Sequence, residues 1–388
     1  MNARRYRLLT ELLEQPTAPF REEHIVTMVR HVLERAHVPF FCDPVGNIII
    51  GCGSRAEYRR LIRAKSKEPL RVFMAHMDHP GFHGARWVSN ARLKVKWHGG
   101  SPAKHLAGSR VWLATSEDYW AEGKLGRVQL LKSKRAINTA EVHVIGPVKT
   151  PRPKPNALYG GFMFRAPVWR AGKKLFTKAA DDLIGVFAVV STALDLHVKN
   201  RGKKMQPFLG LLTRAEDVGF LGAIGHFELD WLARARRPVV CVSLETSRTL
   251  PGALVGHGPV VRLGDRRTVF HAGYLKVLAD VARDTLPNNH QLRIMDGGTC
   301  EATAAIAFGL PAIGLSVPLG NYHNEGFEGG PGCRAPRGPA PEFVHLDDVA
   351  GMLTLCQALM RAGLAWNEPW KAQRRQMRKR LRDYRRLL

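Results

Sequence analysis

Four segments of the chain are apolar at nearly every position, which is typical of central parallel strands with both faces covered. They span residues 70–75, 208–213, 239–244 and 312–318. Between them apolar residues recur at helical spacing. The expected helices are two within residues 5–38 and one each at 184–198, 220–233, 271–284, 301–308 and 347–363. This alternation predicts an α/β fold, with a mixed, mostly parallel sheet covered by helices on both faces.

The pattern changes between residues 85 and 170, where short alternating segments such as 92–97 are separated by glycines. A proline-rich stretch at 147–155 cannot be helical. We therefore expect an inserted small β-barrel at 85–170, within a discontinuous catalytic domain of residues 1–84 and 171–370. Residues 53–68 are expected to form a polar connection, and residues 371–388 a basic helical tail.

Composition excludes several classes of protein. No apolar run reaches about 18 residues, so no membrane-spanning helix and no membrane partner are expected. The first residues lack the apolar centre of a signal peptide. The six cysteines form no C-x-x-C pair, which argues against a disulfide framework and a thiolate zinc site. A cytoplasmic location is the resulting prediction.

The formal net charge of +26 is unusual, and the tail alone does not explain it. Residues 371–388 hold nine Lys or Arg and one acid, so most of the excess lies elsewhere. Such a field attracts nucleic acid, anionic membrane or acidic peptides, although a dispersed charge also simply maintains solubility. No zinc finger or RNA-binding motif accompanies the charge, so nucleic acid is a partner that no motif supports.

Polar residues able to bind metal follow the predicted strands. Open parallel sheets bind ligands beyond the carboxyl ends of their strands, so these groups should converge at one edge. Another pair opens the helix that follows the barrel. The residues are His76, Asp78, Asp181, Asp182, Glu216, Asp217, Glu245 and His323.

Imidazole and carboxylate groups are standard zinc ligands. Two histidines and several carboxylates are enough for two ions that share a bridging carboxylate. A water molecule on such an ion can have its pKa lowered to about 7, which makes hydroxide available as a nucleophile. One further carboxylate must remain off the metals to move the proton.

The ordered motifs resemble those of the cocatalytic di-zinc exopeptidases, most closely the glutamyl-aminopeptidase type that assembles into tetrahedral particles. The resemblance runs from the opening helices to the last predicted ligand. Its motifs are Pro44-Val45-Gly46-Asn47, Ala75-His76-Met77-Asp78, Ala180-Asp181-Asp182, Glu216-Asp217-Val218-Gly219, Gly258-Pro259, Gly297-Gly298-Thr299 and His323.

The resemblance implies a role for each site residue. It implies that His76 and Glu245 bind one ion, that Asp217 and His323 bind the other, and that Asp181 bridges the two. The implied cofactors are two divalent metal ions, zinc first, with cobalt or manganese as alternatives.

The remaining implied roles are catalytic or supporting. Glu216 is implied to be the general base and acid, Asp78 to stabilise the site behind His76, and Asp182 to fix the backbone of its neighbour. The chain departs from the family in having His79 where Glu is usual and Cys300 where an acid is common. The resemblance therefore implies no substrate preference, and we expect neither His79 to be a ligand nor Cys300 a nucleophile.

The family also commonly has Glu at position 217 and Asp at position 245, the reverse of this chain. We interpret the chain as an aminopeptidase acting on peptides. A carboxypeptidase or N-acyl-amino-acid deacylase using the same site, and a nucleic-acid-binding protein that retains the scaffold, are the alternatives. The barrel resembles a dimerisation module, which implies a homo-oligomer and a role in substrate access.

Overall fold

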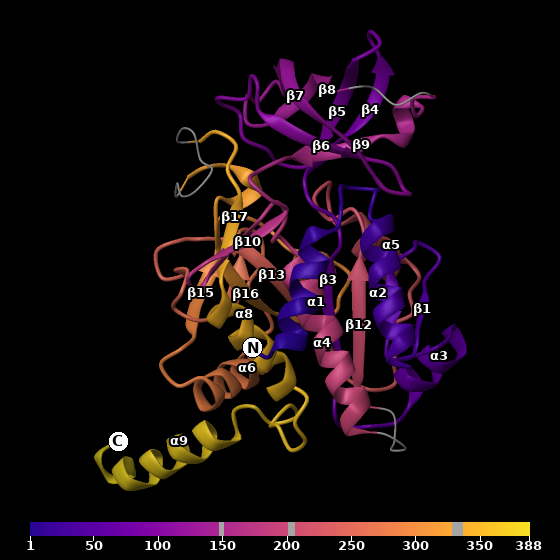
Figure 1. Cartoon of the computed structure of the whole chain (residues 1–388). Helices are drawn as coiled ribbons and strands as arrows, with labels where there is room; N and C mark the ends of the chain where they lie inside the picture. Colours follow the sequence, from indigo (N-terminus) through magenta and orange to yellow (C-terminus); the bar gives the residue numbers. More distant parts are fainter. Residues whose placement is uncertain (147–150, 201–205, 328–336) are drawn as a thin grey trace.

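The computed structural model describes residues 1–146, 151–200, 206–327 and 337–388, and it has a large α/β part and a smaller barrel (Figure 1). Cys333 and part of the proline-rich stretch at 147–155 lie outside these residues. The predicted fold class is confirmed. No helix among the described residues is long and apolar enough to cross a membrane.

The centre of the large sheet consists of the four predicted apolar strands, which lie next to one another and run parallel. In sheet order they are β12 (Phe208–Thr213), β3 (Leu70–His76), β13 (Val239–Arg248) and β16 (Ala312–Gly320). β3, β12 and β16 are buried along their entire length, as expected for strands covered on both faces. Their carboxyl ends point the same way and define one edge.

Antiparallel strands extend the sheet on both sides. One side ends in a hairpin, the other in three short strands, and a further pair branches from β16. These strands are β1 (Phe40–Cys42), β2 (Ile48–Ile50), β17 (Glu342–His345), β11 (Lys174–Thr177), β10 (Val168–Ala171), β14 (Val260–Asp265) and β15 (Gln291–Met295).

Helices cover both faces of this sheet. One hydrophobic core contains the inner faces of α1 (Ala3–Glu14), α2 (Glu23–Arg35), α4 (Leu183–Lys199), α6 (Ala272–Thr285) and α8 (Leu346–Ala358). A second core, on the other face, contains those of α3 (Arg55–Arg63), α5 (Leu221–Glu228) and α7 (Glu301–Ala307).

Helix α3 corrects the expectation of a polar connection at residues 53–68. Tyr58, Leu61 and Ile62 are buried on one face, and the Ser54 side chain accepts a hydrogen bond from the Glu57 amide. Arginines occupy much of the outer surface. The apolar face consists of only three residues, so the helical spacing was not recognised in the sequence among the surrounding charged residues.

Six strands form the closed barrel above the sheet (Figure 1). In barrel order they are β4 (Gly81–Trp87), β5 (Arg92–His98), β8 (Ile137–Ile145), β7 (Tyr119–Leu130), β6 (Arg110–Ala114) and β9 (Tyr159–Phe162). The barrel has its own apolar core. At the other end of the molecule, the chain ends in helix α9 (Lys371–Tyr384), which has no buried residue (Figure 1).

Candidate metal centre

The expected site residues converge at the carboxyl edge of the sheet because the central strands are in register. His76 ends β3, and its pairing partner Thr213 ends β12, immediately before the loop that carries Glu216 and Asp217. Met74 pairs with Ser243 of the neighbouring strand β13, so Glu245 lies at the same level as His76. Parallel pairing of the strands therefore brings His76, Glu216 and Glu245 together although they are far apart in the sequence.

Asp181 lies between the two histidines with one oxygen toward each. Its Oδ1 is 3.6 Å from Nε2 of His76, and its Oδ2 is 3.5 Å from Nε2 of His323. Nε2 of His323 is also 3.3 Å from Oδ1 of Asp217. A carboxylate that faces two separate imidazoles has the arrangement required of a bridging ligand.

Several buried ligand atoms lack a hydrogen-bond partner among the described residues. They are Asp181 Oδ1, Asp217 Oδ2, Glu245 Oε1 and His323 Nε2. Unpaired buried polar atoms are costly, and a divalent cation would satisfy all of them. Ligand atoms of His76, Asp181 and Glu245 lie within 4.8 Å of one another, as do those of His76, Glu216 and Asp217. The donor set therefore fits metal ions, and zinc in particular accepts imidazole with carboxylate oxygen.

Charges within the cluster shift the titration of its members. Burial lowers the pKa of His323, but the nearby carboxylates of Asp181 and Asp217 raise it to about 10. Burial raises the pKa of Asp181, whereas the nearby imidazoles of His323 and His76 bring it below its usual range. Burial raises the pKa of Glu245 to about 8, with Arg262 acting in the opposite direction. The ionised carboxylate of Asp181 thus favours a positive charge next to it, which is also the condition for binding a metal cation.

Glu216 lies beside the proposed ligands without touching Asp181. Its Oε2 is 3.9 Å from Nε2 of His76. Burial raises its pKa well above the ordinary value; nearby His76 lowers it, and the carboxylates of Glu245 and Asp217 raise it further. A carboxyl group that holds a proton readily and borders the ligand cluster has the properties of a proton carrier.

Asp78 and Asp182 hold backbone segments of the site. The Asp78 carboxylate accepts the backbone N–H groups of Glu216 at 2.9 Å and Asp217 at 3.2 Å, and its Oδ1 is 3.6 Å from Nδ1 of His76. Asp182 Oδ1 accepts from the Gly185 amide at 3.1 Å, as a helix N-cap does. Asp182 therefore begins α4 and orients the segment that carries Asp181.

Glu342 of β17 is a site residue that sequence reasoning missed. Its fully buried carboxylate accepts the N–H groups of Ala180 at 2.7 Å and Asp181 at 3.1 Å with one oxygen, and that of His323 at 2.8 Å with the other. One side chain thereby positions the backbone of Asp181 and that of His323 together. A single Glu in a short strand gave no signal in the sequence.

His79 and Cys300 are both buried. His79 Nδ1 lies 2.7 Å from the carbonyl oxygen of Asp181, and its Nε2 lies 3.3 Å from Asn324 Oδ1. His79 therefore contacts the backbone of the proposed ligand Asp181, and its ring packs edge-on against that of His323 with the ring centroids 6.4 Å apart. Burial raises the pKa of the Cys300 thiol to about 12, which makes it a poor nucleophile.

The barrel contributes backbone to the site. A Cβ atom on Gly100, just after β5, would lie 2.1 Å from Nδ1 of His323, and one on Gly99 would lie 3.2 Å from Cβ of Asp217. Only a residue without a side chain can approach the imidazole this closely. The barrel therefore encloses one side of the candidate metal centre.

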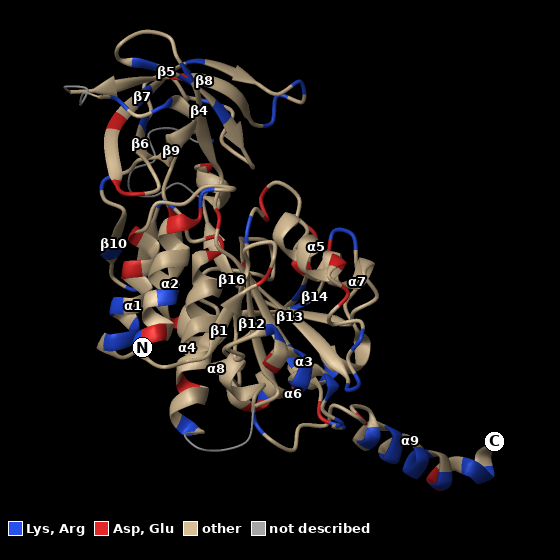
Figure 2. Ribbon diagram, turned by 90° about the vertical axis from the view of Figure 1, so that its right-hand side faces the viewer, with Lys and Arg blue, Asp and Glu red and all other residues tan. Residues whose placement is uncertain are grey.

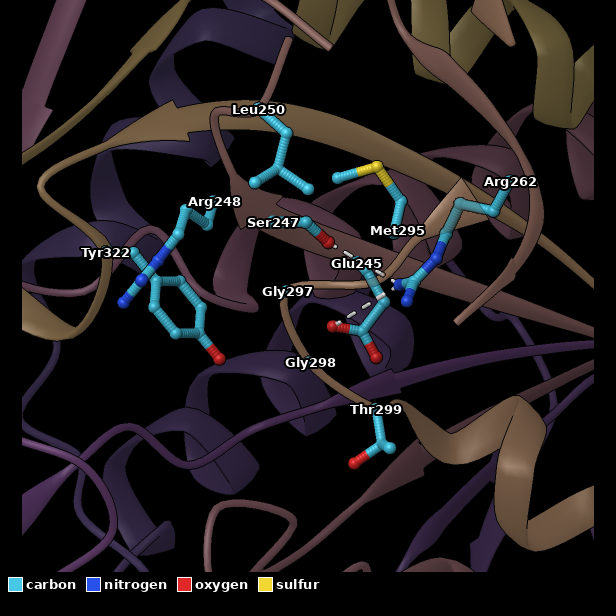
Figure 3. Close-up of a pocket in the computed structure, with 10 residues that line it drawn as sticks. All are labelled: Glu245, Ser247, Arg248, Leu250, Arg262, Met295, Gly297, Gly298, Thr299 and Tyr322. Atoms are coloured by element: carbon cyan, nitrogen blue, oxygen red, sulfur yellow. Dashed lines mark hydrogen bonds and ion pairs between the residues drawn. The ribbon is translucent and has the colours of Figure 1, made fainter. Parts of the chain in front are cut away.

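A pocket with about 350 Å³ of empty volume adjoins the cluster (Figure 3). Glu245, Arg248, Arg262 and Tyr322 are among its lining residues. Arg262 is buried; its Nη1 lies 4.0 Å from Glu245 Oε2 and 3.5 Å from Ser247 Oγ, while its Nε has no hydrogen-bond partner among the described residues. The pocket thus joins a proposed metal ligand to a buried positive charge.

Comparison with known proteins supports the resemblance. The model of the M42 glutamyl aminopeptidase family matches residues 159–326, less than half of the chain, in a region that contains all the site residues described above except His76, Asp78 and Glu342. The comparison with curated proteins found no match.

Solved structures share the fold over nearly the whole chain. The TET1 peptidase of Pyrococcus horikoshii is 19% identical, with 92% of this chain and 99% of that chain covered and a TM-score of 0.69. A TET aminopeptidase from a marine sediment thaumarchaeon is 18% identical, with coverages of 95% and 99% and a TM-score of 0.70. Yeast aminopeptidase 1 is 12% identical, with coverages of 95% and 98% and a TM-score of 0.64.

The family match confirms the prediction of an enzyme of the metallo-aminopeptidase type. The fold likeness extends this similarity beyond the matched residues. The predicted resemblance therefore holds: the chain is similar to M42 glutamyl aminopeptidases over residues 159–326 and has the fold of the TET aminopeptidases.

Proposed function

We propose that this protein is a di-metal aminopeptidase that removes N-terminal residues from peptides. The observation that best supports the proposal is the position of Asp181, with one carboxylate oxygen toward each of His76 and His323. Around Asp181 we assign two metal positions, which we call half-sites. His76 and Glu245 would form one half-site, and His323 and Asp217 would form the other.

Two divalent ions at these half-sites would supply a water molecule acidic enough to be deprotonated near neutral pH and a Lewis acid for the scissile carbonyl. Glu216 would take the proton from that water and deliver it to the departing amine. Asp78 would keep Glu216 aimed through its bond to the Glu216 amide. Gly99 and Gly100 would limit water on the His323 side, because the backbone there leaves no room for a side chain.

The proposal predicts a chelator-sensitive activity that requires a free amine. Aminoacyl chromogenic substrates should be cleaved, activity should disappear when the metal is removed, and Zn²⁺, Co²⁺ or Mn²⁺ should restore it. N-acetylation of the same substrates should abolish cleavage, and the measurement is the initial rate on each matched pair. Cleavage only of the acetylated member would identify a deacylase, and release of C-terminal residues from peptides a carboxypeptidase.

We further propose that the arginine-lined pocket receives an acidic N-terminal side chain. Within the part of the chain that the structure describes, Arg262 Nε has no hydrogen-bond partner, and Arg248 lies over the Tyr322 ring with its guanidinium carbon 5.2 Å from the centroid. Arg262 borders Glu245, whose charge would be engaged by metal when the site is loaded, and Arg248 also lines the pocket. A carboxylate substrate group that enters this pocket would then meet positive charge from Arg262 and Arg248 on its lining.

Replacing Arg248 by Met is expected to lower kcat/KM for glutamyl substrates by roughly 10- to 100-fold, since a hydrogen bond to a charged group is lost. Activity on leucyl substrates should change little, and the ratio of the two values is the measurement. Arg248 is half-buried, so replacing it should disturb the fold less than removing the buried Arg262 would. Arg262→Lys is a second variant, and it keeps the positive charge. An unchanged ratio in both variants would contradict the assignment.

We also propose a homo-oligomer with the barrel at its interfaces. The Pyrococcus horikoshii TET1 peptidase, which shares this fold, is described as assembling into a tetrahedron or a large octahedral shell. The same fold over 92% of this chain supports a similar mode of association.

A further inference from the structure

Helix α9 presents an exposed apolar stripe. Met377, Leu381 and Tyr384 follow one another at intervals of four and three residues, so they lie on one face of the helix. Their exposed fractions are 67%, 54% and 62%. The described part of the chain does not cover this stripe, because no residue of α9 is buried.

The rest of α9 is strongly basic. Residues 371–388 contain nine Lys or Arg and one acid, Asp383. Within this fully described segment, only Lys371 and Arg374 form ion pairs, both with Glu368 at the base of the helix. The basic residues beyond Arg374 therefore face solvent without an acidic partner, and several follow one another at the four-residue spacing at which like charges repel, such as Arg378 and Arg382.

The helix lies apart from the body of the protein. In both views α9 projects beyond the sheet domain, at the end of the molecule opposite the barrel (Figures 1 and 2). An isolated helix of 14 residues is only marginally stable in water, and internal charge repulsion weakens it further. A surface that neutralises the charge and covers the stripe would stabilise it.

We propose that α9 binds the surface of a lipid bilayer that carries acidic headgroups. The basic flanks complement the headgroup charge, and Met377, Leu381 and Tyr384 match the apolar boundary just below it. A helix that lies in the surface needs no spanning segment, so this proposal departs from the expectation of no membrane partner that the sequence suggested. Nucleic acid would neutralise the charge but leave the stripe in water, and a second copy carries the same positive charge.

The test uses the full chain and vesicles of phosphatidylcholine, with or without about 30% phosphatidylserine, in a sedimentation assay. The protein should bind the acidic vesicles and not the neutral ones. Met377→Gln/Leu381→Gln removes the stripe and keeps every charge. Arg378→Gln/Lys379→Gln/Arg382→Gln removes three charges and keeps the stripe. Each is expected to weaken binding to acidic vesicles by about tenfold or more.

Arg59→Gln/Arg63→Gln/Lys65→Gln is the matched control, because it removes three exposed charges from the α3 region, where the apolar face is already buried. This control should bind within about twofold of the unaltered protein. All variants should keep their peptidase activity on small substrates, which shows that they are folded and separates this inference from the proposed function.

Three results would overturn the inference. The first is no binding of the unaltered protein to acidic vesicles. The second is equal weakening by the control, which would indicate a dispersed charge effect. The third is salt-sensitive binding to RNA that is tighter than binding to vesicles and is unchanged in Met377→Gln/Leu381→Gln. That result would identify nucleic acid as the partner of α9.

Discussion

Replacing Glu216 by Gln is expected to lower kcat by roughly 10²- to 10⁴-fold while both metal positions remain filled. Glu216 borders the ligand cluster at 3.9 Å from His76 Nε2, and its backbone is held by Asp78. Glutamine keeps the shape and the backbone contact but cannot accept and return a proton. The loss should therefore appear in kcat with little change in KM.

The measurement combines steady-state kinetics with elemental analysis of the purified variant. Glu228→Gln is a matched control, because it makes the same chemical change at an exposed residue of α5 that is not among the proposed site residues. Its activity should equal that of the unaltered protein. Undiminished turnover by Glu216→Gln with metal bound would show that another group moves the proton.

The second large effect is expected from Asp181→Asn. The substitution removes the charge that faces both imidazoles, at 3.6 Å and 3.5 Å, and turns one ligand oxygen into an amide nitrogen. Metal content should fall from two ions per chain to one or none. Activity should fall by roughly three orders of magnitude, since the metal pair contributes several kcal/mol to transition-state stabilisation.

Thermal unfolding provides a readout that does not depend on turnover. A ligand that binds only the folded state raises its stability, so added zinc should raise the Tm of the unaltered protein and have a much smaller effect on Asp181→Asn. Asp284→Asn serves as the control because Asp284 is an exposed residue of α6 and is not among the residues that line the pocket or form the proposed site. Two full equivalents of metal in Asp181→Asn would contradict the bridging role.

The sequence itself determined the architecture of the sheet domain. Strands apolar on both faces and amphipathic helices are local patterns, so residues 70–75, 208–213, 239–244 and 312–318 could be assigned without a structure. The parallel order then implies that residues following these strands meet at one edge, which is why His76, Glu216 and Glu245 could be grouped. His323 follows the fourth strand and Asp181 opens the helix after the barrel, so both were placed with them, and the motif resemblance added their expected roles.

Only the tertiary structure decided the contacts around those residues. Glu342 carries no local signal, because its role comes from three amides contributed by two distant segments. The closeness of Gly100 to His323 depends on how the barrel sits on the sheet. Helix α3 was hidden because its buried face is short and surrounded by charge. Periodicity records which face of an element is apolar, whereas long-range hydrogen bonds and the approach of separate segments depend on packing, and packing has no repeat along the chain.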